Sequence, residues 1–268
     1  MMPSNQRPNP SMFKHRRVNA VPAAPGVSRQ PVHAFRGNVV PRGNRKLSAL
    51  VDSGIFFSLG AAVNINAVAL FHSLYDSRAA TTDAIRDEVR TNALKGKPDK
   101  PDLRPAATLA RNYFINSGRV AIHVVEASQS FAASLQLILA QLRNHEAARS
   151  ALSGFQGASS LQKHAGEATL IALALTQNNV VILTNDSGAS FVAGAQQPSI
   201  PSLHFADVLK ELVCDSRGGI TAAAAAAAFD LACAVSDITS SAKPADATAF
   251  LTCAFDDVGQ RCSACDVS

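Results

Sequence analysis

The sequence predicts an α/β domain, a three-layer α/β/α sandwich around a central and mostly parallel sheet. Two short runs, 47–51 and 180–183, are predominantly apolar, as strands buried on both faces of a parallel sheet are. Segments with the apolar spacing of helices alternate with such strand-like runs. Each of the two runs ends in a polar turn, DSG at 52–54 or TND at 184–186. Strands that alternate with helices therefore favour a sheet covered on both faces.

The elements follow one another in a regular order. The first strand leads into a helical region that reaches about Tyr75, and Asn64 is expected to divide it into two helices. Thr82 or Asp83 can cap the next helix, because a side-chain oxygen at that position accepts a backbone N–H. The expected strands are 47–51, 78–82, 120–125, 180–183 and 202–205. The expected helices are 54–75 with its break, 82–94, 106–116, 127–149, 166–177, 187–194 and 206–213, with loops at 95–105 and 150–160.

The chain divides into three parts by composition. Residues 1–46 contain nine basic residues and no acidic one, and are rich in Pro, Asn, Ser and Gly. We expect a disordered arm there, which either attracts polyanions such as nucleic acid or is simply a solvated tail. Residues 47–213 form the α/β domain, and 214–268 an alanine-rich helix with a cysteine-containing tail. Because one CxxC pair, Cys262 and Cys265, supplies too few ligands, we expect no structural zinc site.

Several functional classes find no support in the sequence. There is no Gly-x-Ser-x-Gly elbow and no phosphate-binding loop ending in Gly-Lys-Ser/Thr, which argues against a serine hydrolase and a nucleotide-driven motor. Residues 53–71 carry no charge and superficially resemble a membrane anchor, but Asn64 and Asn66 interrupt them, so we expect buried helices. The amino terminus has no apolar core after its basic residues, so we expect a cytoplasmic protein without contact to a membrane.

Four acidic residues stand where predicted elements begin or end. Asp52 and Asp186 end two strands, Glu88 lies one to two turns into a helix, and Glu167 opens another helix. In open parallel sheets ligands collect outside the carboxyl ends of the strands, so these side chains can meet there. Oxygen donors are the ligands that Mg²⁺ and Mn²⁺ prefer, and clustered carboxylates repel one another unless cations neutralise them. The pattern therefore indicates a divalent metal site that could hydrolyse a phosphodiester.

Four local motifs in this order resemble the PIN domain family over roughly residues 47–213. They are LVDS at 50–53, TDAIRDEV at 82–89, GEATLIALA at 166–174, which is similar to the GEA-type helix, and VILTND at 181–186. The resemblance implies a PIN-like fold and an endoribonuclease dependent on Mg²⁺ or Mn²⁺ that leaves a 5′ phosphate. It also implies RNA as substrate and, because many family members are toxins of bacterial toxin–antitoxin pairs, a toxin whose partner is an antitoxin protein. A second copy of the chain is a further candidate partner. The catalytic and metal-binding residues would be Asp52, Glu88, Glu167 and Asp186.

Neighbouring polar residues are candidates for supporting roles. Ser53, Asp83 and Thr184 could hydrogen-bond a ligand carboxylate or a metal-bound water, although Asp83 is also a good helix cap. Lys163 and His164 precede Glu167 and could contact phosphate or lie in a solvated loop.

Three other interpretations stay open. The acids could merely cap helices or favour helix dipoles, in which case no metal binds. The fold could be a catalytically silent module that binds RNA or protein. The chain could also be a membrane-tethered structural protein that uses residues 53–71.

Overall fold

The computed structural model describes residues 48–125, 129–153, 164–215, 219–238, 244 and 246–251. The basic arm at 1–46, most of the Gly/Ser-rich connection, Lys163 and the CxxC pair lie outside these residues. All elements described below belong to the part of the chain from Val32 onward, which clusters as one compact unit.

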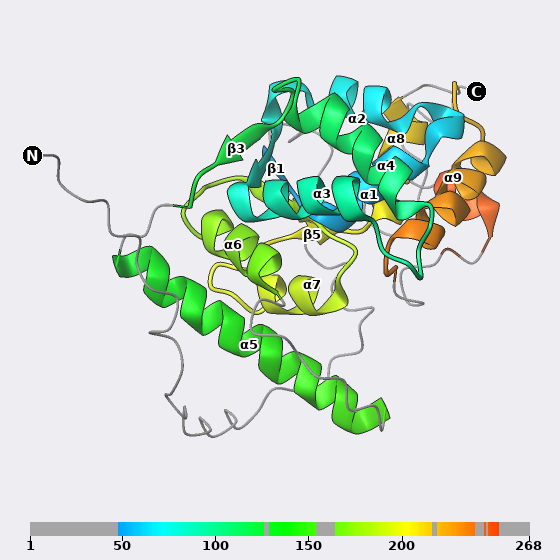
Figure 1. Ribbon diagram of the computed structural model, residues 1–268. Coiled ribbons are helices and arrows are strands. Elements are labelled where there is room, and N and C mark those ends of the chain that lie inside the picture. Colours follow the sequence, from blue (N-terminus) through cyan, green and yellow to red (C-terminus); the bar gives the residue numbers. More distant parts are fainter. Residues whose placement is uncertain are drawn as a thin grey trace, which may run out of the picture. The chain divides into compact units, whose positions relative to one another are not determined.

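A five-stranded parallel sheet forms the centre of the domain, as the sequence predicts (Figure 1). The strand order is β3-β2-β1-β4-β5, so β1 is central and pairs with both β2 and β4. The strands are β1 (Ser48–Val51), β2 (Ala79–Thr82), β3 (Ala121–His123), β4 (Val180–Leu183) and β5 (Ser202–Leu203). All residues of β2 and β4 are buried, which explains their continuous apolar or small-residue character.

Helices flank this sheet and confirm the predicted α/β/α class (Figure 1). They are α1 (Ser53–Ala61), α2 (Ala67–Tyr75), α3 (Asp83–Lys95), α4 (Leu103–Ala110), α5 (Gln129–Ser153), α6 (Ala165–Ala174), α7 (Ser187–Gly194), α8 (Phe205–Asp215) and α9 (Ala222–Val235). Short helical turns η4 (Val63–Ile65), η5 (Asp76–Arg78), η6 (Arg111–Ile115) and η8 (Ala247–Leu251) complete the described elements. The predicted break at Asn64 is confirmed, because η4 separates α1 from α2.

Several element boundaries differ from the sequence-based expectation. The strand expected at 202–205 ends at Leu203, and the helix expected at 166–177 ends at Ala174. The strand expected at 120–125 is shorter, since β3 pairs with β2 only over Ala121–His123 at the edge of the sheet. The helix expected at 106–116 begins earlier and changes at Arg111 into a π-helical turn, η6. The helix expected to end at 149 continues as α5 to Ser153, so part of the expected loop is helical.

The alanine-rich helix α9 packs against α1. Its buried residues recur every three to four positions, which puts Phe229 and Val235 on one face with the small alanines. Just beyond the helix, the Ser236 hydroxyl donates to the Gly54 carbonyl at 2.8 Å, and its oxygen lies 2.9 Å from the Ser58 hydroxyl. Helix α9 is thus tied to the first turns of α1, the helix that follows Asp52.

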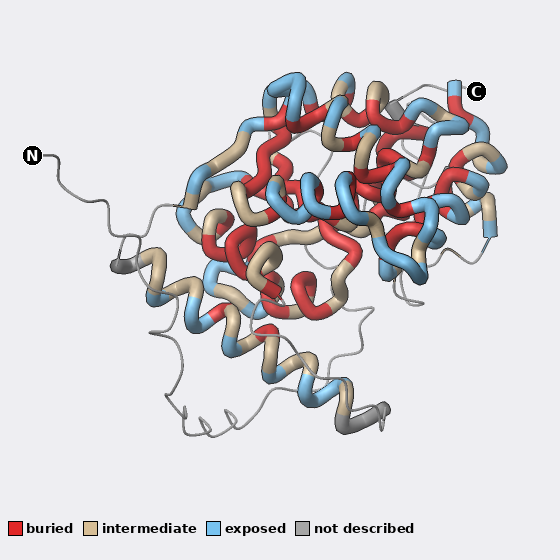
Figure 2. Tube along the Cα trace, in the orientation of Figure 1, coloured by how far each residue is buried: buried red, intermediate tan, exposed pale blue. Residues whose placement is uncertain are grey.

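The apolar core follows the sheet and the inner faces of its helices, whereas α5 has a largely exposed or half-buried surface (Figure 2). Within the described ranges, no helix has both the length and the apolar character required to cross a membrane. The uncharged stretch at 53–71 is divided among α1, η4 and α2, and most of its large side chains are buried in the core.

Candidate metal centre

Asp52 lies at the carboxyl end of the central strand, where it is buried with 5% of its surface exposed. Its Oδ1 accepts the backbone N–H of Ser53 at 2.7 Å. Its Oδ2 accepts the Thr184 hydroxyl at 2.9 Å. Asp52 is therefore the N-cap of α1, and it is also held by the end of the adjacent strand β4. The two roles are compatible because a carboxylate has about four lone-pair sites.

The three polar residues after β4 have separate roles. Thr184 donates to Asp52 and accepts the backbone N–H of Asp186 at 3.1 Å, so it links two of the predicted acids. Asn185 is structural: its amide donates to the Ser58 hydroxyl at 3.0 Å, and its carbonyl accepts the Phe205 N–H at 3.0 Å. Asp186 caps α7, because its Oδ1 accepts the N–H of Ala189 at 2.7 Å.

Glu167 lies in the first turn of α6, and Glu88 comes from α3. The two helices approach closely at Gly166, where an added methyl group would lie 2.5 Å from Ile85 Cδ1 and 3.5 Å from Glu88 Oε2. Although Glu88 as a residue is exposed, its carboxyl group thus lies beside the start of α6. The glycine of the GEA sequence leaves room for the Ile85 side chain, whose terminal methyl would have to shift if a side chain were added there.

The charges of neighbouring acids act on Asp52 and on Glu167. Burial raises the pKa of Asp52 well above its usual range, and the charges of Glu167 and Glu88 raise it further. Burial also raises the pKa of Glu167, with added contributions from Asp186 and Glu88. Burial raises the pKa of Glu88, while a hydrogen bond from the Ser53 side chain opposes the shift. Of the four acids singled out in the sequence, Glu167 and Asp186 belong to one set of potential ligands within 4.8 Å, whereas Asp52 and Glu88 lie outside that set. The charges of Glu88 and Glu167 nevertheless act on Asp52.

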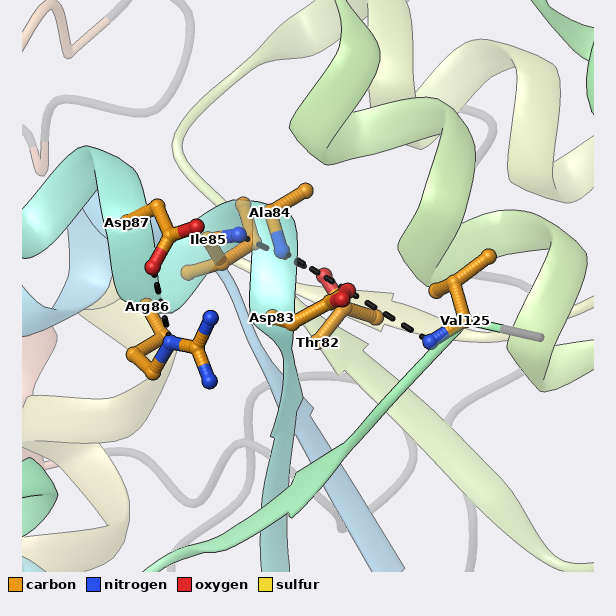
Figure 3. A network of polar contacts seen from close by, with 7 residues as sticks. All are labelled: Thr82, Asp83, Ala84, Ile85, Arg86, Asp87 and Val125. Carbon is orange, nitrogen blue, oxygen red and sulfur yellow. Dashed lines mark hydrogen bonds and ion pairs between the residues drawn. The ribbon is translucent and has the colours of Figure 1, made fainter. Parts of the chain in front are cut away.

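Asp83 belongs to a different network (Figure 3). Its Oδ1 accepts the backbone N–H of Ala84 at 3.0 Å and that of Val125 at 3.5 Å, which joins α3 to the segment after β3. Thr82 is the N-cap of α3 and accepts the N–H of Ile85 at 3.4 Å. Of the three supporting candidates, Ser53 and Thr184 thus hydrogen-bond acids of the cluster, whereas Asp83 hydrogen-bonds backbone.

From the sequence, His164 is expected only as a phosphate contact or a solvated loop residue, and not as a metal ligand. Together with Glu167 and Asp186 it forms a set whose potential ligand atoms all lie within 4.8 Å of one another. Its ring Nε2 lies 2.9 Å from Oε2 of Glu146, a residue of the long helix α5. One sequence feature could have indicated this position of His164. It lies three residues before Glu167 at the start of a helix, and side chains at that spacing share one face.

Helix α5 contributes further polar groups at this edge because it packs against α6 and α7 (Figure 1). The His145 ring stacks on Phe191 with 4.7 Å between centroids. A guanidinium N–H of Arg149 donates to the Ser187 hydroxyl at 2.7 Å, one residue beyond Asp186. A cationic side chain therefore lies beside the acids, where it could meet a phosphate.

Comparisons with family models, curated proteins and solved structures give no match to this chain. The geometry of the cluster and the chemistry of its residues therefore have to indicate what the chain does.

The electrostatics predict an unusual dependence of stability on pH. Because the pKa values of Asp52, Glu88 and Glu167 are raised in the fold, the folded state binds more protons than the unfolded state once pH exceeds the unfolded pKa values. The stability that the cluster contributes while its carboxyl groups are protonated should be fully present at low pH. It should be lost as the pH rises through the pKa values of the folded state. We would measure melting temperatures of the wild type and of Asp52→Asn from pH 4.5 to 8 in the presence of a chelator. The difference between the two curves gives the effect of the Asp52 charge on stability.

The wild type should lose stability relative to Asp52→Asn as pH rises. Millimolar Mn²⁺ should reverse this difference, because a metal binds the deprotonated carboxylates. Parallel curves for the two proteins in the chelator would contradict the proposed repulsion.

Proposed function

We propose that this chain is a metal-dependent nuclease that hydrolyses RNA phosphodiester bonds with Asp52, Glu88, Glu167 and Asp186. One observation supports the proposal above all: beside the carboxyl edge of a parallel sheet, the charges of Glu167 and Glu88 raise the pKa of Asp52, and those of Asp186 and Glu88 raise the pKa of Glu167. Repulsion of this kind lowers stability and would be offset by a divalent cation. The resemblance of the four motifs to the PIN family supports RNA as the substrate class and Mg²⁺ or Mn²⁺ as the cation.

The donor set suits such a cation. Oδ1 of Asp52 and Oδ1 of Asp186 each accept a backbone N–H and keep lone pairs for a ligand, while Glu167 adds a third carboxylate. When bound, a divalent cation would supply a more acidic water and stabilise negative charge on the phosphate. Thr184 would hold Asp52 and the start of α7 in a fixed relation, because it hydrogen-bonds both.

The chain's cationic groups would position the substrate. The side chain of Arg149, a residue of α5, reaches Ser187 at the N-terminus of α7. A guanidinium and the N–H groups of a helix N-terminus both favour an anion. The basic segment 1–46 would add long-range attraction to RNA. We also propose an antitoxin protein as partner, because many members of the family that the chain resembles are toxins of toxin–antitoxin pairs, and a second copy of the chain as a further partner.

Two adjacent acids of α3 offer a matched test. Glu88 lies at the cluster, whereas Asp87 is 62% exposed and pairs with Arg86 at 2.8 Å. Glu88→Gln should slow cleavage of a mixed RNA substrate in Mn²⁺ at least tenfold, since it removes one carboxylate from the site. Asp87→Asn should cleave like the wild type. Cleavage would be followed by gel, and a 5′ phosphate would be detected as a substrate for a 5′-phosphate-dependent exonuclease.

The result that overturns the proposal is equally specific. If the wild type does not cleave RNA in Mn²⁺ or Mg²⁺, or if Glu88→Gln and Asp87→Asn cleave alike, the four acids do not form a nuclease site.

A further inference from the structure

His164 has a strained backbone and a buried ring. It precedes α6 with φ 70° and ψ 7°, a left-handed conformation that costs a non-glycine residue about 1–2 kcal/mol. Its side chain is 8% exposed. Its Nδ1 is buried and has no hydrogen-bond partner among the described residues. A buried polar atom without a partner costs about 1–3 kcal/mol, so both features call for an explanation.

Glu146 settles which ring nitrogen carries the proton. Nε2 lies 2.9 Å from the Glu146 carboxylate, which can only accept, so the proton of a neutral ring resides on Nε2. The free lone pair is then on Nδ1. A carboxylate that accepts a hydrogen bond from one ring N–H, while the other ring nitrogen faces a cation, is the usual arrangement around metal-binding histidines. Glu146 comes from α5 and His164 from the start of α6, two helices that pack together.

The distances suit a single ion. One ring nitrogen of His164 and one carboxylate oxygen each of Glu167 and Asp186 lie within 4.8 Å of one another. Two ligands on opposite sides of an ion at about 2.1 Å each are about 4.2 Å apart. Side-chain movements of less than an ångström would therefore close the set around an ion.

We propose that His164 binds the metal through Nδ1 together with Glu167 and Asp186, that Glu146 positions its ring, and that the site consequently prefers a first-row transition ion to Mg²⁺. Imidazole nitrogen is a good ligand for Zn²⁺ and related ions, whereas Mg²⁺ strongly favours oxygen. This inference deepens the proposed function, since it rests on the same metal site. It does not depend on which bond, if any, the protein hydrolyses.

A purely structural ion pair between His164 and Glu146 is the competing explanation. In that case a protonated ring would leave a buried Nδ1–H without an acceptor, and a neutral ring would leave a buried lone pair without a donor. A metal ion satisfies Nδ1 and neutralises the neighbouring carboxylates, which the ion pair alone does not.

Metal selectivity gives the first test. His164→Asn keeps a residue that tolerates the left-handed conformation and replaces the nitrogen ligand with an amide. Calorimetric titration of the full chain should show tighter binding of Mn²⁺ and Zn²⁺ than of Mg²⁺. The variant should lose at least tenfold in affinity for Mn²⁺ and Zn²⁺ and change little for Mg²⁺. The control is His72→Asn, the same exchange on α2, where the His72 ring contacts Tyr113 and should not affect any titration.

A spectroscopic measurement makes the inference independent of affinity. Pulsed electron paramagnetic resonance of the Mn²⁺ complex should show coupling to a directly bound nitrogen, which changes when histidine is labelled with ¹⁵N. The signal should disappear in His164→Asn and persist in His72→Asn.

Glu146 requires its own variants because it acts through His164. Glu146→Ala should weaken Mn²⁺ binding about 10–100-fold, the usual effect of losing such an outer carboxylate. Glu146→Gln keeps an oxygen that can accept a hydrogen bond from the Nε2–H group. It should restore most of the affinity for Mn²⁺. A merely structural role would lower the melting temperature of both without altering the ratio of Mn²⁺ to Mg²⁺ affinity.

Two results would overturn the inference. One is a wild-type Mn²⁺ complex without nitrogen coupling, and the other is an unchanged ion preference in His164→Asn. Failure of the nuclease proposal looks different: Mn²⁺ would bind with nitrogen coupling, but RNA would remain intact.

Discussion

Asp186→Asn should lower RNA cleavage in Mn²⁺ by about a thousandfold, comparable to the largest losses seen when one group that stabilises developing charge is removed. The variant should fold, because asparagine is a good N-cap and its side-chain oxygen can still accept the Ala189 N–H. Removing one charge from the cluster also relieves repulsion on Glu167, whose pKa Asp186 raises. The metal-free variant should therefore melt at the same temperature as the wild type or higher.

The response to metal separates a ligand from a mere helix cap. Binding to the folded state stabilises a protein by mass action, so the wild type should gain melting temperature as Mn²⁺ is added. Asp186→Asn should gain much less. Asp186→Ser, which also caps well but has no carboxylate, should behave in the same way. If both variants respond to Mn²⁺ as the wild type does and still cleave RNA, Asp186 is only the cap of α7.

The second large effect concerns the packing of α1 against α4. A methyl group added at Gly60 would lie 2.1 Å from the carbonyl oxygen of Ala106 and 2.8 Å from its carbon. Both obstacles are backbone atoms, so no side-chain rotation can relieve the clash and the helices must separate. Gly60→Ala should lower the free energy of unfolding by about 3 kcal/mol or more, near the upper end for overpacking. For a domain of this size, the melting temperature should fall by roughly 6–12 °C.

Gly54 provides the matched control because it lies on the same helix. A methyl group there would be 3.6 Å from Asp52 Oδ2 and 3.7 Å from Asn185 Cβ, which are ordinary contacts. Gly54→Ala should leave stability unchanged or raise it by about 0.5–1 kcal/mol through helix propensity. Denaturant titration would measure both variants. Equal stabilities for Gly60→Ala and Gly54→Ala would show that α1 and α4 can move apart at little cost.

The sheet was predictable from the sequence because its strands are short, buried and followed by polar turns. The runs at β1 and β4 have few polar residues, and the acids after them lie at the carboxyl edge for reasons of topology alone. The helices α6 and α7 were predictable in the same way, by their local spacing. The π-helical turn η6 and the early end of β3 were not, since both depend on neighbours that local patterns do not specify.

The candidate site was predictable only in part. Its acids stand beside recognisable motifs, but the role of His164 depends on where α5 lies, and Glu146 is distant from Glu167 in the chain. A long helix with a weakly amphipathic surface does not reveal which of its turns faces a partner. The packing of α9 on α1 was similarly hidden, because a run of alanines indicates a helix without indicating its buried face.

The order of the strands has a consequence for how the protein is made. Strand β1 is among the first to be synthesised, but β4, its neighbour on one side, follows only after the long helix α5 and α6. A chain whose synthesis has reached β3 can pair β1 with β2 while the other edge of β1 stays open, and open edges promote aggregation. Such a chain also lacks Glu167 and Asp186. Until β4 is made and closes the open edge of β1, the nascent chain would be prone to aggregation, and the cluster of acids is complete only when Asp186 follows β4.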